Sequence, residues 1–274
     1  MPGLLGEAQN PLAVNVPAKG SRAPPVHVIN LDRSESRLDE FRRWNAHMPD
    51  IERVAAIDGS VMNRRQLSTQ DIISGDLRYT DAALGCALSH LSLGRLAAAQ
   101  SAPITVWEDD AILHGSFSDI AARLISTLQQ DWDLVVWGWN FDQTLLFDLV
   151  PGVSPCLARF DQEQLRRGLG SFQSQPLSPQ LFRLFLALGT VCYSISSAGS
   201  RKLLERSVLI RNFTLDFPTV NSSLVNVGIA VVMNAAYPKL NAFVSFPPLA
   251  VTKNDHVAST IKGSRSQGAQ AGRG

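Results

Sequence analysis

Short runs of consecutive apolar residues alternate along the chain with longer segments in which apolar residues recur at helical spacing. The apolar runs predict buried strands at 26–31, 54–57, 104–107, 134–137, 191–195 and 229–233. Helices are predicted at 34–47, 80–99, 117–130, 197–206 and 217–225. Continuous apolar strands that alternate with helices favour an α/β fold, with a mainly parallel sheet covered by helices on both faces. Ligands of such sheets bind beyond the carboxyl ends of the strands.

The two ends of the chain depart from this pattern. Residues 1–24 hold proline, glycine and alanine and end near a Pro-Pro pair, so we expect a flexible N-terminal arm. Residues 262–274, with the sequence KGSRSQGAQAGRG, offer almost no apolar surface to bury. That composition predicts a disordered C-terminal tail, and the folded domain is therefore expected at 25–261.

The sequence pattern predicts neither a secretory signal nor a membrane-spanning helix. The first 24 residues contain no basic start followed by an apolar core, so no secretory signal is predicted. The longest apolar region, around 181–195, is interrupted by Arg183 and Gly189 and is too short for the roughly 20 residues of a spanning helix. These features favour a soluble, cytoplasmic protein and leave peripheral contact with the inner membrane open.

Charge and cysteine content narrow the classes of function further. The formal net charge is +1, whereas a nucleic-acid-binding protein usually carries a strong basic excess, so we expect no nucleic-acid partner. Cys86, Cys156 and Cys192 lie far apart, each in an apolar stretch. Without a CxxC pair they predict buried packing residues rather than a disulfide framework or a zinc site.

Three acidic residues directly follow the predicted strand at 104–107. Alternation along an extended chain places Glu108 and Asp110 on one side and Asp109 on the other. Mg²⁺ and Mn²⁺ prefer oxygen ligands and often bridge carboxylates to a diphosphate. Such an ion would stabilise the charge that a nucleoside diphosphate gains as it leaves a sugar. A solvated acidic turn is the alternative interpretation of the same triplet.

Several segments together resemble glycosyltransferase family 25, the lipooligosaccharide and procollagen galactosyltransferase group. The resemblance covers roughly residues 26–206. Its segments, in order, are VINLDR at 28–33 with Arg37 after it, RVAAIDG at 53–59, LGCALSH at 84–90, WEDDA at 107–111, and GTVCYSIS at 189–196.

This resemblance implies a fold, a reaction and its partners. The fold would be GT-A-like and Rossmann-type, formed by residues 25–261. The reaction would transfer a hexose, with galactose as the first choice, from a UDP-sugar donor with inversion at the anomeric carbon. A divalent metal, Mn²⁺ or Mg²⁺, would assist. The acceptor would be a glycan or lipooligosaccharide, such as the lipopolysaccharide core.

The resemblance also suggests roles for individual residues. Donor-binding residues are expected to be Asn30, Asp32, Arg33, Arg37, Glu108 and Asp109. Metal ligands are expected to be Asp110, Glu108 and His256, and catalytic residues Asp216, as the base, and His90.

Each of these roles has a structural alternative. Arg37 equally fits a solvent-facing helix position, and Asp32 or Asp216 equally fits a residue that starts a helix. His90 equally fits a structural histidine, and His256 a position in a disordered tail. Trp137 and Trp139 fit either core packing or stacking against a sugar.

Three rival functions remain open at this point. One is a degenerate glycosyltransferase that binds a nucleotide sugar without turnover. A metal-dependent phosphohydrolase is the second, although the sequence has no HD, HxH or DxDxT-like partner motif. The third is an interaction domain, in which the spacing of the LGCALSH and WEDDA segments would be coincidence.

Overall fold

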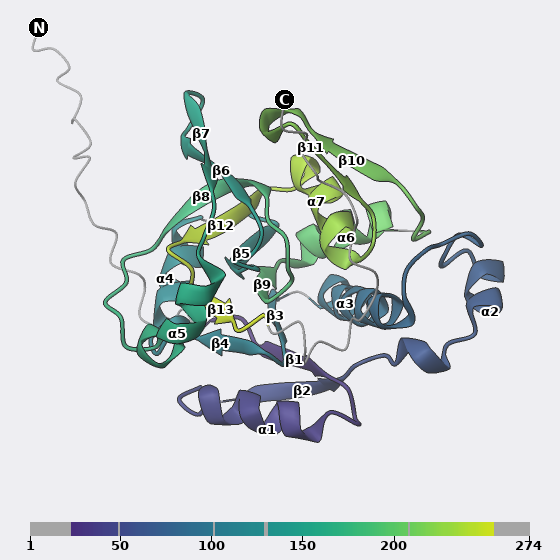
Figure 1. The fold of residues 1–274 in the computed structure, drawn as a ribbon, viewed down its shortest axis with the longest axis horizontal. Coiled ribbons are helices and arrows are strands. Elements are labelled where there is room, and N and C mark those ends of the chain that lie inside the picture. The colour runs from purple at the N-terminus through teal and green to yellow at the C-terminus, as the bar shows by residue number, and fades with distance from the viewer. Residues whose placement is uncertain (1–22, 49, 101, 129–130, 208, 255–274) are drawn as a thin grey trace, which may run out of the picture.

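The computed structural model describes residues 23–254 except 49, 101, 129–130 and 208. Its main feature is a nine-stranded sheet with the strand order β2-β1-β3-β9-β5-β12-β8-β6-β7 (Figure 1). These strands are β1 (Val26–Asn30), β2 (Ile51–Ala55), β3 (Ile104–Glu108), β5 (Leu134–Gly138), β6 (Leu145–Val150), β7 (Ser154–Ala158), β8 (Gln180–Leu186), β9 (Cys192–Ile195) and β12 (Ala242–Phe246).

The α/β class is confirmed, but the prediction of a mainly parallel sheet is wrong. Parallel pairing joins β1 to β2, β1 to β3 and β5 to β12. The other five described pairs of this sheet are antiparallel, because β9 runs between β3 and β5 in the opposite direction and because β12, β8, β6 and β7 alternate in direction. A strand buried on both faces is apolar throughout whichever way its neighbours run, so apolar runs alone do not reveal strand direction.

Helices cover both faces of the sheet, as predicted. They are α1 (Glu35–Trp44), α2 (Arg64–Thr69), α3 (Asp81–Ala99), α4 (Phe117–Thr127), α5 (Gln162–Phe172), α6 (Ser197–Ser207) and α7 (Ile229–Ala236). On one face, the alternate strand residues that include Val106 and Val136 pack against α3, α6 and α7, which lie together in Figure 1. On the other face, Trp107 and Trp137 pack against Phe41 of α1 and Phe117 of α4.

The segment after α6 differs most from the prediction. A helix was expected at 217–225, but β10 (Thr214–Phe217) and β11 (Ser222–Val225) form an antiparallel hairpin there. Asn221, with φ 47°, supplies the left-handed conformation that the connection needs. A strand was expected at 229–233, yet α7 occupies this stretch and buries Val231, Val232 and Met233. Packing in the core overrides the local preference of β-branched residues for strands.

A small second sheet forms directly after the acidic triplet. β4 (Ala111–Leu113) pairs antiparallel with β13 (Ala250–Thr252). Glu108 ends β3 and Ala111 begins β4, so Asp109 and Asp110 form a tight turn between two strands. The triplet is therefore held in place from both sides.

Two sequence predictions concern the ends of the chain and membrane spans. Almost all of the predicted arm at 1–24, the whole predicted tail at 262–274 and His256 lie outside the described residues. Among the described helices, α3 is long and apolar enough to span a membrane by length and composition. In this fold, 61% of that window is buried, and α3 packs beside α6 as part of the core.

Candidate active site

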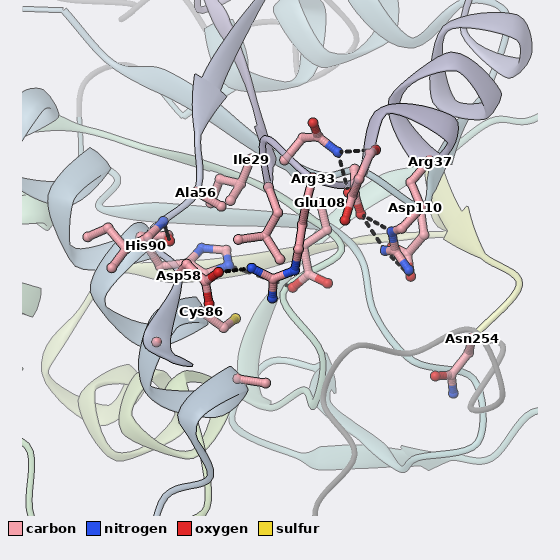
Figure 2. A pocket seen from close by; sticks show the side chains of 18 residues that line it. Ile29, Arg33, Arg37, Ala56, Asp58, Cys86, His90, Glu108, Asp110 and Asn254 are labelled. Carbon is pink, nitrogen blue, oxygen red and sulfur yellow. Dashed lines mark hydrogen bonds and ion pairs between the residues drawn. The ribbon is translucent and has the colours of Figure 1, made fainter. Parts of the chain in front are cut away.

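A cavity opens where the parallel strands β1, β2 and β3 end. The side chains around it come from the turn after β1, the loop after β2, the first half of α3 and the acidic triplet (Figure 2). The space inside the cavity, open solvent at its mouth included, amounts to about 850 Å³. The position agrees with the rule that ligands bind beyond the carboxyl ends of sheet strands.

One wall depends on a contact between two backbones. A Cβ atom added to Gly85 of α3 would lie 2.4 Å from the Ile57 carbonyl oxygen, and one added to Gly59 would lie 1.7 Å from the Asp81 carbonyl oxygen. The hydroxyl of Ser89 accepts a hydrogen bond from the Ile57 N–H at 2.8 Å and donates one to the Gly85 carbonyl at 2.7 Å. These small residues hold α3 against the loop after β2.

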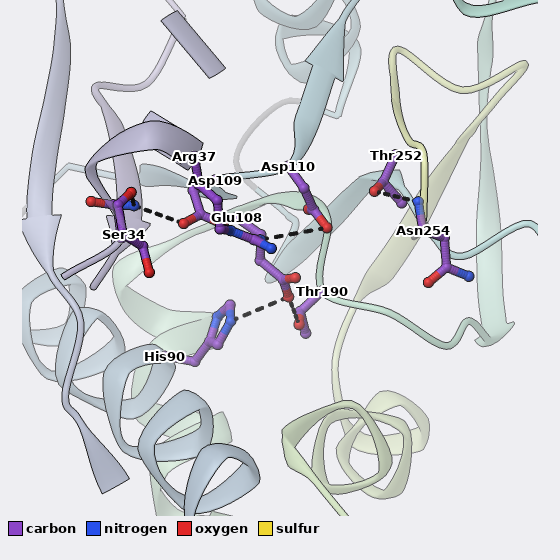
Figure 3. A network of polar contacts seen from close by, with 10 residues as sticks. Ser34, Arg37, His90, Glu108, Asp109, Asp110, Thr190, Thr252 and Asn254 are labelled. Carbon is purple, nitrogen blue, oxygen red and sulfur yellow. Dashed lines mark hydrogen bonds and ion pairs between the residues drawn. The ribbon is translucent and has the colours of Figure 1, made fainter. Parts of the chain in front are cut away.

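The central carboxylate of the triplet, Asp109, is held by a polar network (Figure 3). It accepts a hydrogen bond from the Asn30 amide at 2.7 Å and one from Nε of Arg37 at 2.9 Å. Arg53 in turn donates to the Asn30 side-chain oxygen at 3.1 Å. Asp109 therefore fixes α1 and β1 relative to the acidic turn, while Arg37 also lines the cavity.

The two flanking carboxylates, Glu108 and Asp110, have different surroundings. Glu108 is partly buried, and its desolvation acts to raise its pKa, but the His90 ring, a hydrogen bond from Thr190 and the charge of Arg37 together lower the pKa below its usual value. Burial and the negative charge of Glu108 raise the pKa of Asp110 to about 7. The Oδ1 atom of Asp110 is buried and has no hydrogen-bond partner among the described residues.

A histidine and a cysteine from α3 face the same carboxylate. His90 Nε2 lies 3.6 Å from Glu108 Oε1, and His90 Nδ1 lies 3.0 Å from the hydroxyl of Tyr193. Cys86, one helical turn before His90, points toward the same space. Burial raises the pKa of the Cys86 thiol well above its usual value, and the nearby acidic triplet raises it further.

A second cavity lies on the other side of the acidic turn. It holds about 580 Å³, counted to its mouth, and shares three residues with the first: Arg37, Asp109 and Asp110. The ring of Trp44 lines it, and Lys253 Nζ lies 5.6 Å from the centre of that ring. The acidic turn thus forms a wall between two hollows.

Comparison with known proteins gives the family of this fold and site. The model of glycosyltransferase family 25 (LPS biosynthesis protein) matches residues 23–218. The chain belongs to glycosyltransferase family 25. It is also 27% identical over 205 residues to a Bos taurus protein named "Probable inactive glycosyltransferase 25 family member 3". That alignment covers 70% of this chain and 30% of the relative, so the chain spans about a third of the relative's length.

The family resemblance noted in the sequence is thereby confirmed, and the structure brings together most of the predicted site. Asn30, Arg33, Arg37, His90 and the acidic triplet all line the first cavity. Arg33 forms an ion pair with Asp58, which lines the same cavity (Figure 2).

Other predicted residues lie elsewhere. The exposed side chain of Asp32 pairs with Arg53 and does not line the cavity. Asp216 is exposed on β10, where it accepts a hydrogen bond from Ser223 at 2.6 Å, and is absent from the described cavity walls. Trp137 and Trp139 are buried in the core, as one of their two interpretations expected.

Sequence reasoning did not assign site roles to three residues of this family member: Asp58, Cys86 and Thr190. Cys86 was interpreted as a packing residue, although it is only partly buried. The available signal was its spacing, because residues four apart share one face of a helix and Cys86 precedes His90 by four. Thr190 gave no such signal, since it meets Glu108 only through the pairing of β9 with β3.

Proposed function

We propose that this chain transfers a hexose, with galactose as the first choice, from a UDP-sugar to a glycan acceptor such as the lipopolysaccharide core. The reaction is inverting and depends on a divalent metal, Mn²⁺ or Mg²⁺. Membership of family 25 supports glycosyl transfer as the reaction class. The charge of the first cavity supports the metal and the diphosphate.

That charge is the observation that carries the proposal. Four carboxylates, those of Asp58 and the triplet, line the cavity with two guanidinium groups, those of Arg33 and Arg37. The excess is two negative charges when all six groups are ionised. A diphosphate is itself an anion and would be repelled by this cavity unless a divalent cation entered with it.

The residues present fit such a cation. The unpartnered, buried Oδ1 of Asp110 and the carboxylate of Glu108 offer hard oxygen ligands on the side of the triplet that faces away from the Asn30 network. A divalent cation bound there supplies Lewis-acid stabilisation of the departing diphosphate. His256, the third predicted ligand, stays a prediction because it lies outside the described residues.

The chain's own residues then have distinct tasks. Arg33 and Arg37, which line the cavity, donate hydrogen bonds to diphosphate oxygens. The second cavity takes the acceptor, whose sugar face packs on Trp44 and whose hydroxyl meets the anomeric carbon at the edge of the acidic turn that both cavities share. The base that removes the acceptor proton remains the predicted Asp216, which must approach this wall to act.

A donor screen tests the proposal. UDP-galactose, UDP-glucose and UDP-N-acetyl sugars are supplied with acceptor, with and without Mn²⁺, and released UDP is measured. We expect metal-dependent release with one donor. The Asp110→Ala variant should lose this release, whereas Asp119→Ala, an exposed carboxylate on α4, should retain it. Full activity of the Asp110 variant would overturn the metal assignment.

The name of the bovine relative favours one second candidate, a nucleotide-sugar-binding protein without turnover. In that case UDP would bind with metal while no donor released UDP above the rate without enzyme. Glu108 and Asp110 would hold the cation in either case, so the donor screen decides between the two candidates. We propose a cytoplasmic site of action, peripheral to the inner membrane, where a lipid-linked acceptor is available.

A further inference from the structure

Three side chains of different chemistry converge at the floor of the first cavity. One ligand atom each from Cys86, His90 and Glu108 lies within 4.8 Å of the other two. Cys86 and His90 come from adjacent turns of α3, and Glu108 comes from the end of β3. The carboxylate is thus shared between the acidic turn and this thiol–imidazole pair.

One ring nitrogen of the buried His90 is unsatisfied. The residue is only 3% exposed, and its Nε2 atom has no hydrogen-bond partner among the described residues. A buried polar atom without a partner is costly. This one points toward Glu108, but the distance of 3.6 Å is too long for a hydrogen bond.

That distance suits two ligands of one metal ion. Nitrogen and oxygen atoms each about 2.1 Å from a tetrahedral ion lie roughly 3.4 Å apart. The observed 3.6 Å is close to this value. The ligand atoms of Cys86 and Glu108 lie within 4.8 Å of a His90 ring nitrogen and of each other, and both side chains are partly exposed.

A neighbouring hydroxyl orients the imidazole. The Tyr193 hydroxyl lies 3.0 Å from His90 Nδ1. If Nδ1 carries the hydrogen and donates it to the tyrosine oxygen, the lone pair of Nε2 is available to a metal. Histidine ligands in metal sites are usually fixed in this way through their second nitrogen.

We propose that Cys86, His90 and Glu108 bind a borderline-soft transition ion such as Zn²⁺ or Co²⁺ in preference to Mg²⁺. Thiolate and imidazole ligands favour these ions, whereas Mg²⁺ takes oxygen ligands. Three protein ligands leave a coordination position facing the cavity, as in catalytic rather than structural sites. The ion's role in sugar transfer rests on the proposed function, but its binding does not.

Two other uses of Cys86 fit the structure less well. A disulfide would need a second thiol at bonding distance, but the other two cysteines, Cys156 in β7 and Cys192 in β9, are free in this structure. A nucleophilic cysteine needs a positively charged surrounding that stabilises its thiolate. Cys86 instead faces the acidic triplet, whose negative charge disfavours a free thiolate.

Co²⁺ titration of the chelator-treated full chain tests the proposal through absorbance, independently of catalysis. We expect one equivalent of Co²⁺ to produce the near-ultraviolet thiolate-to-cobalt charge-transfer band, and Zn²⁺ but not excess Mg²⁺ to abolish it. Cys86→Ser should lack the band, and the matched control Cys156→Ser should keep it. Tyr193→Phe should weaken Co²⁺ affinity by about 10–100-fold while keeping the band.

A second measurement on the wild-type chain covers the case in which the Cys86 variant fails to fold. One equivalent of Zn²⁺ should protect Cys86 from alkylation, as read by peptide mass spectrometry, and Mg²⁺ should not. Absence of the band in the wild type, or unprotected Cys86 with Zn²⁺ present, would overturn the proposal. UDP release measured on the same samples reports separately on the proposed transferase, so either idea can fail alone.

Discussion

Asp110 gives the sharpest prediction from the site, because burial and the charge of Glu108 disfavour the ionised form of its carboxyl group. Burial and the adjacent Glu108 raise its pKa from 3.8 to about 7. In the unfolded chain the group titrates near its ordinary value. Between these two pKa values the folded protein keeps the proton and the unfolded chain loses it, so the free energy of unfolding decreases as pH rises through this window.

The size of the effect follows from the shift. About three pKa units correspond to about 4 kcal/mol at full strength. Because 36% of the Asp110 side chain is exposed, solvent screening reduces this to roughly 1–2 kcal/mol. Asp110→Asn removes the charge. Its gain in the free energy of unfolding over the wild type should therefore be near zero at pH 4 and reach roughly 1–2 kcal/mol by pH 8. For a chain of this size the gain corresponds to a Tm increase of about 2–8 °C.

The measurement is thermal unfolding of both proteins from pH 4 to pH 8 in the presence of a chelator. Asp109→Asn is the matched control, since it removes a neighbouring carboxylate that is paired with Arg37 and Asn30. That variant should be destabilised at pH 8 by about 1–3 kcal/mol. Parallel pH profiles for wild type and Asp110→Asn would refute the argument that this carboxylate is strained by its surroundings.

Three further predictions follow from other features. Gly85→Ala should lower the free energy of unfolding, measured in urea, by about 3 kcal/mol or more, because the added methyl group overlaps the backbone after β2. Its control is Gly168→Ala in α5, where the added methyl group meets open space. That variant should be neutral or stabilised by up to about 1 kcal/mol. Lys202→Met should cost about 3 kcal/mol in the same assay, because it leaves the buried carboxylate of Asp133 without its 2.6 Å ion pair. Asp216→Asn should lower kcat by about 10²–10⁴ without changing UDP affinity if Asp216 is the base; unchanged kcat would exclude that role.

The sequence predicted best those parts of the fold that depend on neighbours along the chain. β1, β3 and β5 were recognised as apolar runs, and α3 was predicted with its correct start, since the Thr80 side chain accepts from the Ala83 N–H at 3.1 Å. These signals are local: strand burial and helix capping are each contained within a few residues.

What the sequence could not supply was information about distant partners. The antiparallel insertion of β9 between β3 and β5 depends on chain crossings that no local pattern records. α7 was mistaken for a strand because its β-branched residues become helical only when packed in the core. The acidic triplet was found because it is a motif of consecutive residues. The sequence did not show that Cys86 lies near it, because folding alone brings α3 beside the end of β3.

The contact between Gly59 and Gly85 leaves the cavity wall no room to adjust to a larger residue. No side chain lies between the two backbones, so nothing there can deform to absorb an added methyl group. A larger residue at either position would displace α3 as a rigid body, and the side chains of Cys86 and His90 would move with it. A substitution at Gly59 or Gly85 would therefore move both side chains away from Glu108 together, and neither would be lost alone.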